Sequence, residues 1–141
     1  MIWKKETTPA ELNSRFRHDL GSLLEIEFTE IGEDFLVARM PVTEKVHQPA
    51  GILHGGASVV LAETLGSVAS GLLIDTERYM AVGLEINANH LRPVKQGYVR
   101  GVCQPVHIGG KTHVWDIRLY DDRGKMNCIS RLTVAIIPQV K

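Results

Sequence analysis

Glu63 is the single full charge between Gln48 and Asp75, in a stretch otherwise made of small, aliphatic and uncharged polar side chains. A helix that is apolar nearly all round is a buried helix, and a glutamate is rarely buried without a partner or a function. A carboxylate in such a place can act as a general base or as a nucleophile. Glu63 is therefore the first candidate catalytic residue.

His54, Gly55 and Gly56 stand at the start of this helix, where the first backbone N–H groups have no intrahelical acceptor and the helix dipole is positive. Glycine lets a substrate oxygen approach those N–H groups, which predicts an oxyanion hole at Gly55. Along a helix, however, Gly55 and Glu63 are about 12 Å apart, whereas catalytic contacts are about 3 Å. We therefore expect an obligate dimer with antiparallel central helices, in which Gly55 of one chain faces Glu63 of the other.

The elements that must position these residues follow from hydrophobic periodicity. Thr8, Pro9 and Glu11 predict a short helix that runs to about Arg17. Alternating patterns and turn residues predict strands at 24–31, 35–42, 79–91, 98–107, 111–120 and 126–137, with an ordered loop at 43–53 and the central helix over about 56–74. We expect an α+β fold in which one apolar helix covers one face of an antiparallel sheet.

Two of these elements carry predictions about faces. In strand 79–91 the alternation places Val82 and Leu84 on one face together with Ile86. On the central helix Leu61 and Leu65 cluster opposite Glu63 and can face the sheet, whereas small side chains on the Glu63 side leave room for a ligand or a second helix.

Composition limits the class of protein. A chain of 141 residues with 44% hydrophobic content fits a single domain over residues 1–141. Sixteen basic and sixteen acidic residues leave no net charge, so we expect neither a nucleic-acid nor a membrane partner. No His, Asp, Glu or Cys spacing indicates a metal site. Cys103 and Cys128 have no CxxC spacing, and no apolar signal segment opens the chain, which together indicate a cytoplasmic protein with reduced thiols.

The run from Gln48 to Ser67 also resembles a known family. With its segments Leu53-His54-Gly55-Gly56 and Leu61-Ala62-Glu63-Thr64, it is similar to the hotdog-fold acyl-CoA thioesterases of the PaaI-like class. The opening Met1-Ile2-Trp3-Lys4 and the segments 83–93 and 101–109 narrow the resemblance to the bacterial branch that contains 1,4-dihydroxy-2-naphthoyl-CoA hydrolases and enterobactin proofreading thioesterases. The resemblance covers essentially the whole chain.

This resemblance implies a hotdog fold, a homotetramer built as a dimer of dimers, and hydrolysis of acyl-CoA thioesters, aromatic ones among them, with no metal or cofactor; carrier-protein thioesters stay open as substrates. In that pattern Glu63 is the base or nucleophile, the N–H of Gly55 polarises the thioester carbonyl, and Gln48 and His54 orient it. Substrate contacts are implied for Thr64, Ser67, Val82, Gly83, His90, Arg92 and Gly109. Ala50 departs from the pattern, since close relatives typically carry a bulky aromatic residue there, which implies a larger or shifted acyl pocket.

Two other functions stay open. An enoyl-thioester hydratase or dehydratase on the same fold would pair a histidine with a carboxylate, and His54 would have to supply it. A non-catalytic acyl-CoA-binding module is the second alternative, although binding alone gives no reason to place a carboxylate in an apolar helix. Neither Ser58 nor Ser67 lies in a G-x-S-x-G elbow, which disfavours a serine hydrolase.

Overall fold

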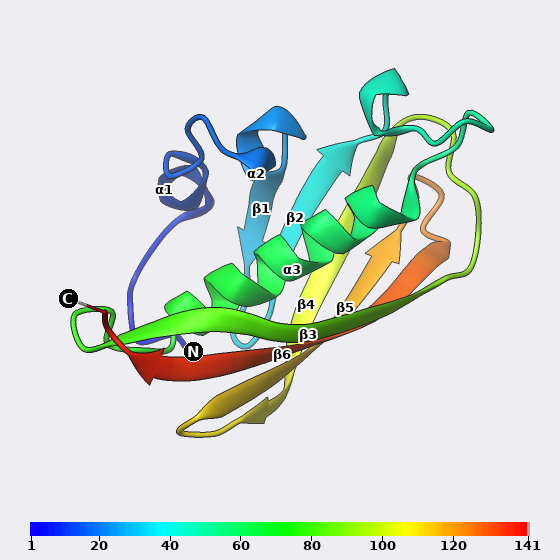
Figure 1. Ribbon diagram of the computed structural model, residues 1–141. Coiled ribbons are helices and arrows are strands. Elements are labelled where there is room, and N and C mark those ends of the chain that lie inside the picture. The colour runs from blue at the N-terminus through cyan, green and yellow to red at the C-terminus, as the bar shows by residue number, and fades with distance from the viewer. Residues whose placement is uncertain (141) are drawn as a thin grey trace.

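One long helix lies in the concave face of a six-stranded antiparallel sheet (Figure 1). The computed structural model describes residues 1–140. The helical elements are α1 (Pro9–Asn13), α2 (Leu20–Leu23), the 3-10 turn η1 (Glu44–Val46) and α3 (Gly55–Gly71). The strands are β1 (Glu27–Ile31), β2 (Leu36–Pro41), β3 (Tyr79–His90), β4 (Tyr98–Ile108), β5 (Thr112–Tyr120) and β6 (Met126–Pro138). They are ordered β1-β2-β4-β5-β6-β3, and the predicted α+β hotdog architecture is confirmed.

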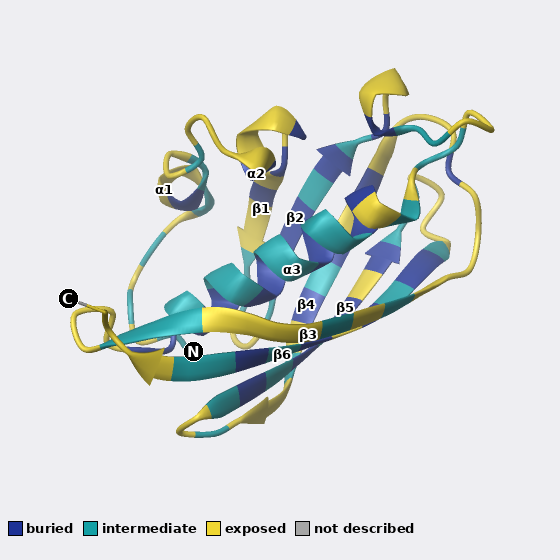
Figure 2. Cartoon of the chain, viewed as in Figure 1, coloured by how far each residue is buried: buried dark blue, intermediate teal, exposed yellow. Residues whose placement is uncertain are grey.

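The large side chains of α3 face the sheet, as the helical periodicity predicts. Leu61 and Leu65 are completely buried, and they belong to the same core as Trp115 on β5 and Leu132 on β6. Figure 2 shows that the middle strands alternate buried and less buried residues beneath α3. Each fully buried leucine contributes roughly 1.5–3 kcal/mol to the stability of the fold. This face of α3 therefore holds the helix, and with it Gly55 and Glu63, in a fixed position on the sheet.

Strand β3 contains a β-bulge that changes which of its side chains face the core. Its pairing with β6 shifts between Gly83 and Glu85. Ile86 packs partly against the core, whereas Val82 is 38% and Leu84 66% exposed. The prediction that Val82 and Leu84 share a face with Ile86 is therefore wrong, because one extra residue in a strand reverses the alternation of its side chains.

The first helix begins as predicted but ends early. The Thr8 Oγ1 accepts a hydrogen bond from the backbone N–H of Glu11 at 3.2 Å, which caps α1. The predicted continuation to Arg17 is wrong, because the chain leaves the helix after Asn13. The side chain of Asn13 is bound to the backbone of Phe28 on β1, donating to its carbonyl at 3.0 Å and accepting from its N–H at 2.7 Å.

The first strand starts later than predicted. Residues 20–23 form α2, which is capped by Asp19, and β1 begins only at Glu27. The reason lies at Glu25, whose φ of 56° is left-handed and interrupts the extended chain that the alternation from Leu24 onward predicts.

The loop at residues 43–53 is ordered and fixes the start of α3. The backbone N–H of Leu53 donates to the Val94 carbonyl, and that of His54 donates to the Val46 carbonyl, both at 2.8 Å. The N-terminus of α3 is therefore held between two loops rather than left free. Within residues 1–140, no helix has the length and apolar character needed to cross a membrane.

Candidate active site

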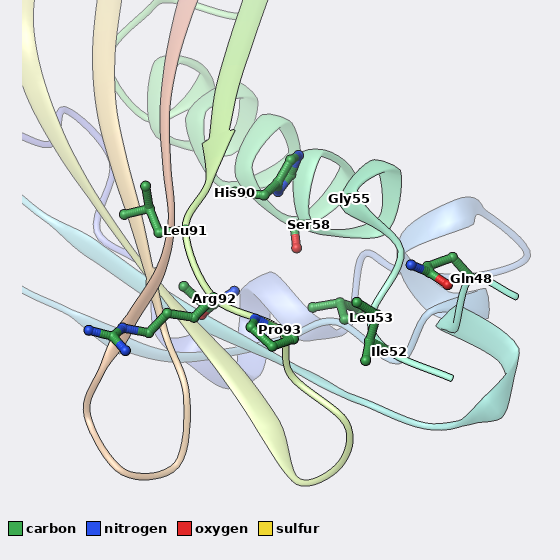
Figure 3. Close-up of a pocket in the computed structure, with 10 residues that line it drawn as sticks. Gln48, Ile52, Leu53, Gly55, Ser58, His90, Leu91, Arg92 and Pro93 are labelled. Atoms are coloured by element: carbon green, nitrogen blue, oxygen red, sulfur yellow. The ribbon is translucent and has the colours of Figure 1, made fainter. Parts of the chain in front are cut away.

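A pocket of about 450 Å³ opens at the N-terminal end of α3 (Figure 3). It is lined by the start of the helix, by the loop before it and by the chain around the end of β3, namely Gln48, Ile52, Leu53, Gly55, Ser58, His90, Leu91, Arg92, Pro93 and Asn127. Four predicted site residues therefore share one cavity: Gln48, Gly55, His90 and Arg92. A concave pocket of this size, with both apolar and polar side chains in its wall, fits a small-molecule site.

The backbone N–H of Gly55 has no acceptor among residues 1–140. It lies at the positive end of a 17-residue helix, where an oxygen that develops negative charge is stabilised. The glycine leaves room for its neighbour, because a Cβ at position 55 would stand 2.7 Å from the Nε2 of His90 and would displace the ring. The imidazole of His90 therefore lies directly beside the Gly55 backbone, in the wall of the same pocket.

His54 caps the helix. Its Nδ1 accepts a hydrogen bond from the backbone N–H of Gly56 at 2.8 Å, which leaves the adjacent N–H of Gly55 as the donor available to a ligand. The imidazole itself is not part of the pocket wall. Within this chain, His54 therefore orients the helix end rather than contacting the cavity.

The carboxamide of Gln48 is held by its own loop. Its Oε1 accepts a hydrogen bond from the backbone N–H of Ala50, so its Nε2 is the group left to donate to a ligand. Figure 3 shows Gln48 and Arg92 on different sides of the opening. Arg92 is exposed and supplies a positive charge at the rim, where it can attract an anionic part of a ligand.

Glu63 does not line the Gly55 pocket. It is half-buried on α3, and its carboxylate meets Gly83 on β3, where a Cβ would come within 3.4 Å of the Glu63 Cδ. Thr64 and Ser67 are half-buried on the same helix, and Val82 is exposed beside Gly83. The structure therefore brings Glu63 and Gly83 into contact, away from the Gly55 pocket, whereas Val82 points to the opposite face of β3 from Gly83.

Gly109 lies in neither group. It belongs to the turn between β4 and β5 and lines a cavity of about 590 Å³ at the other end of α3, together with Lys4, Arg78 and His113. His113 is 2% exposed, and its Nδ1 lies 2.8 Å from the Oγ of Ser70. The same Oγ accepts a hydrogen bond from the Nε1–H of Trp115. Burial lowers the pKa of His113, so the ring is neutral at pH 7 and acts as part of the core.

Two polar residues of the pocket wall are not predicted as site residues from the sequence. Ser58, in the first turn of α3, is 1% exposed, and Asn127, at the start of β6, is 3% exposed. For Asn127 the sequence does contain a signal, since an amide among the apolar residues of a predicted strand argues for a hydrogen-bonded or functional role. Within residues 1–140, no group of three His, Cys, Asp or Glu side chains is placed to hold a metal ion.

The fold and the site together define a class of enzyme. A single helix in the concave face of an antiparallel sheet is the hotdog arrangement. A helix that has a free N–H at its start and a carboxylate farther along its side carries the two groups that acyl transfer needs. Solved structures agree: a variant of thioesterase PA1618 from Pseudomonas aeruginosa superposes with a TM-score of 0.97 at 50% identity, covering 99% of this chain and 100% of that one.

Sequence comparison gives the family. The model of the thioesterase superfamily matches residues 50–128. The chain is 50% identical over 137 residues to the 1,4-dihydroxy-2-naphthoyl-CoA hydrolase of Escherichia coli, covering 97% of this chain and 100% of that protein. It is also 50% identical over 137 residues to the proofreading thioesterase EntH of Cronobacter turicensis, covering 97% and 99%. The chain belongs to the thioesterase superfamily, and it is a thioester hydrolase.

Proposed function

We propose that the protein hydrolyses acyl-CoA thioesters, aroyl-CoA in particular, to the free acid and CoA. The observation that carries the proposal is the unpaired N–H of Gly55, which opens from the positive end of α3 into a pocket. The relative named for 1,4-dihydroxy-2-naphthoyl-CoA hydrolysis supports a CoA thioester with an aromatic acyl group. An acyl carrier protein thioester is the second candidate substrate.

The exposed edge of the sheet supports the proposed dimer. β3 is an edge strand of twelve residues, and it presents Val82 and Leu84 to solvent in the single chain. A long edge strand with exposed apolar side chains is a site for pairing with another chain. Pairing there about a two-fold axis would also cover the half-buried face of α3 that carries Glu63.

A dimer would bring the two groups of site residues together. Gly55 contacts His90 at one end of β3, whereas Glu63 contacts Gly83 near the middle of the strand. With antiparallel helices in the two protomers, Glu63 of one chain lies opposite Gly55 of the other. Each dimer then has two shared sites, and the dimer-of-dimers tetramer is part of the same proposal.

In this arrangement the thioester carbonyl oxygen accepts a hydrogen bond from Gly55 N–H. The partner's Glu63 either removes a proton from water, which attacks the carbonyl carbon, or attacks that carbon directly to form a mixed anhydride that water then hydrolyses. In both routes the C–S bond breaks, CoA leaves as the thiolate and is protonated, and the acyl group leaves as the carboxylic acid. The negative charge that develops on the carbonyl oxygen is stabilised by the positive helix end.

The first test measures free thiol released from aroyl-, short-chain and long-chain acyl-CoA by the wild type and by Glu63→Gln. We expect the variant to lose about 10²–10⁴ in turnover, with the largest wild-type kcat/KM for an aroyl-CoA. Hydration of an enoyl-CoA is measured beside it, since hydration without thiol release would indicate a hydratase. Turnover of Glu63→Gln within a few-fold of the wild type would exclude the proposed role of Glu63.

The second test addresses the shared site. Glu63→Gln and Gln48→Ala are each expected to be nearly inactive alone. If each site takes Gln48 and Gly55 from one chain and Glu63 from the other, a heterodimer of the two variants has one intact site. An equal mixture, refolded together, should then recover about a quarter of the wild-type activity. No recovery in a mixture shown to contain heterodimers would place both residues of each site in one chain.

A cytoplasmic location is also proposed. Its support is the state of the thiols: Cys103 and Cys128 are both buried and unpaired, and burial raises the pKa of Cys128 to about 11. Free thiols persist in a reducing compartment.

A further inference from the structure

The wall of the Gly55 pocket contains a buried hydroxyl group that has no partner in the chain. Ser58 is 1% exposed. Within residues 1–140, the serine hydroxyls that make hydrogen bonds are those of Ser14, Ser70 and Ser130. Buried polar groups are nearly always hydrogen-bonded, because an unpaired one loses its hydration without compensation. Ser58 therefore lacks the partner that the two other buried serines, Ser70 and Ser130, both have.

The hydroxyl of Ser58 is open to the cavity. Figure 3 shows it pointing from α3 toward the side of the cavity where Leu53 and Pro93 lie. In residues 1–140, the one enclosed side-chain N or O atom without a partner is the Oδ1 of Asn127. The Oγ of Ser58 is therefore not sealed off by the protein, and a group bound in the cavity can reach it.

This hydroxyl is suited to binding rather than to nucleophilic attack. A serine nucleophile is activated by a base within hydrogen-bond distance. The imidazole at the start of the helix, that of His54, uses its Nδ1 to accept from the Gly56 N–H, and the Ser58 Oγ has no hydrogen bond within residues 1–140. A hydroxyl without a base still donates one hydrogen bond and accepts two.

The exposure of the pocket wall indicates which part of a thioester reaches Ser58. His90 and Arg92 are exposed at the rim, Gly55 is half-buried, and Ser58 is buried. A thioester whose carbonyl lies at Gly55 has CoA on one side and the acyl group on the other. The phosphate groups of CoA are costly to bury, so the CoA arm leads toward the rim and Arg92. The acyl group then occupies the buried end of the pocket.

We propose that the Oγ of Ser58 forms a hydrogen bond with a hydroxyl substituent of the acyl group and thereby selects hydroxylated aromatic acyl groups. This inference rests on the proposed function and names the substrate class more closely. Ile52 and Leu53 supply apolar surface for the body of the acyl group. A site built to hydrogen-bond a hydroxyl discriminates against the analogue that lacks it, because the polar group of the site then stays unpaired.

The test uses Ser58→Ala with benzoyl-CoA and the ortho, meta and para isomers of hydroxybenzoyl-CoA. The measured quantity is the preference, which is kcat/KM for a hydroxybenzoyl-CoA divided by kcat/KM for benzoyl-CoA. We expect Ser58→Ala to lower this preference by about 5- to 100-fold for at least one isomer, because the substrate hydroxyl is left unpaired in the pocket. The isomer that is affected gives the position of the substituent that meets Ser58.

Ser70→Ala is the matched control, since Ser70 lies on the same helix and is also completely buried. This substitution removes the hydrogen bonds with His113 and Trp115, so it should lower the melting temperature and leave the preference unchanged. Ser58→Ala removes no hydrogen bond within residues 1–140, and alanine favours a helix more than serine does. Its melting temperature should therefore not fall.

Three results would overturn the proposal. An equal loss of kcat/KM with all four thioesters would mean that the hydroxyl serves the part of the substrate that they share. A preference that is unchanged for every isomer would mean that Ser58 meets no substituent. A preference that Ser70→Ala lowers as far as Ser58→Ala does would mean that the effect comes from the stability of the helix.

Calorimetry with the inert thioethers phenacyl-CoA and hydroxyphenacyl-CoA, in its three isomers, separates this inference from the proposed function. If the wild type hydrolyses none of the thioesters, the proposed function fails. Ser58→Ala that weakens the binding of a hydroxyphenacyl-CoA more than that of phenacyl-CoA would still support the role of Ser58. Equal changes in the binding of all the thioethers would exclude it.

Discussion

The Glu63 carboxylate lies directly against the backbone of Gly83, on the strand next to its helix. A Cβ at position 83 would stand 3.4 Å from the Glu63 Cδ and would overlap the space of its Oε2. The absence of a side chain on β3 at this point therefore sets where the carboxylate can be.

Gly83→Ala should lower kcat without unfolding the protein. The φ of Gly83 is not among the left-handed values, so alanine fits the backbone, and the end of the flexible Glu63 side chain must move instead. A displacement of about 1 Å can cost about 10²-fold in rate. The measurement is kcat on an aroyl-CoA together with the melting temperature. Gly71→Ala is the matched control, since its Cβ would meet no atom within 4 Å, and equal activity of the two variants would contradict the role of Gly83.

Gly55→Ala tests the contact with His90. The new Cβ would collide with the imidazole, so we expect a loss of about 10- to 100-fold in kcat/KM as the ring and the helix end separate. In a His90→Ala background the same change has no imidazole to displace and should cost much less. A double-mutant cycle measures the coupling between the two positions. Additive losses would mean that Gly55→Ala acts on something other than His90.

The buried cysteines make a further prediction that matters for every assay of thiol release. Cys103 and Cys128 are both completely buried, and burial raises the pKa of each thiol. Because the thiolate is the reactive form, the native protein should react with a thiol reagent far more slowly than free CoA does. Both cysteines should react at once in denaturant. Rapid labelling of the native chain would show that one of them becomes accessible.

The fold was predictable from the sequence wherever hydrophobic periodicity sets the structure. The leucine face of α3 and the strands after it follow from periodicity alone, since Leu61 and Leu65 have one face of a sheet to cover. The order of the strands was not predictable, because β3, the first strand after α3, pairs with β6, the last strand of the chain. The β-bulge at Gly83 also lay beyond prediction, since bulges depend on pairing rather than on side-chain pattern.

The residues of the candidate site are also of two kinds, those that local sequence predicts and those that depend on contacts between distant segments. Gly55 and Glu63 could be found because their chemistry comes from local features, a helix start and a lone charge. Asn127 could not, because its place in the pocket wall depends on the pairing of β6 with β3, two segments far apart in the chain. The contact of Gly55 with His90 was missed for the same reason, since it joins the start of α3 to the far end of β3.

His113 should make the stability of the protein depend on pH. Burial lowers its pKa below the usual 6.5, with smaller contributions from nearby His107 and Lys4, while a hydrogen bond with the Gly109 backbone opposes the shift. Below about pH 6.5 the unfolded chain therefore binds more protons at this residue than the folded chain does. The stability is fully present above that pH and falls as the pH drops toward the lowered pKa of the folded state.

Urea unfolding at about pH 8 and about pH 5 measures this effect through the change in the free energy of unfolding. His113→Asn should reduce the loss on acidification, although it lowers the stability at pH 8 by removing the contact with Ser70. His18→Asn serves as the control, because it removes an exposed imidazole from a left-handed position that asparagine tolerates. If wild type and His113→Asn lose the same free energy on acidification, other groups must account for the pH dependence.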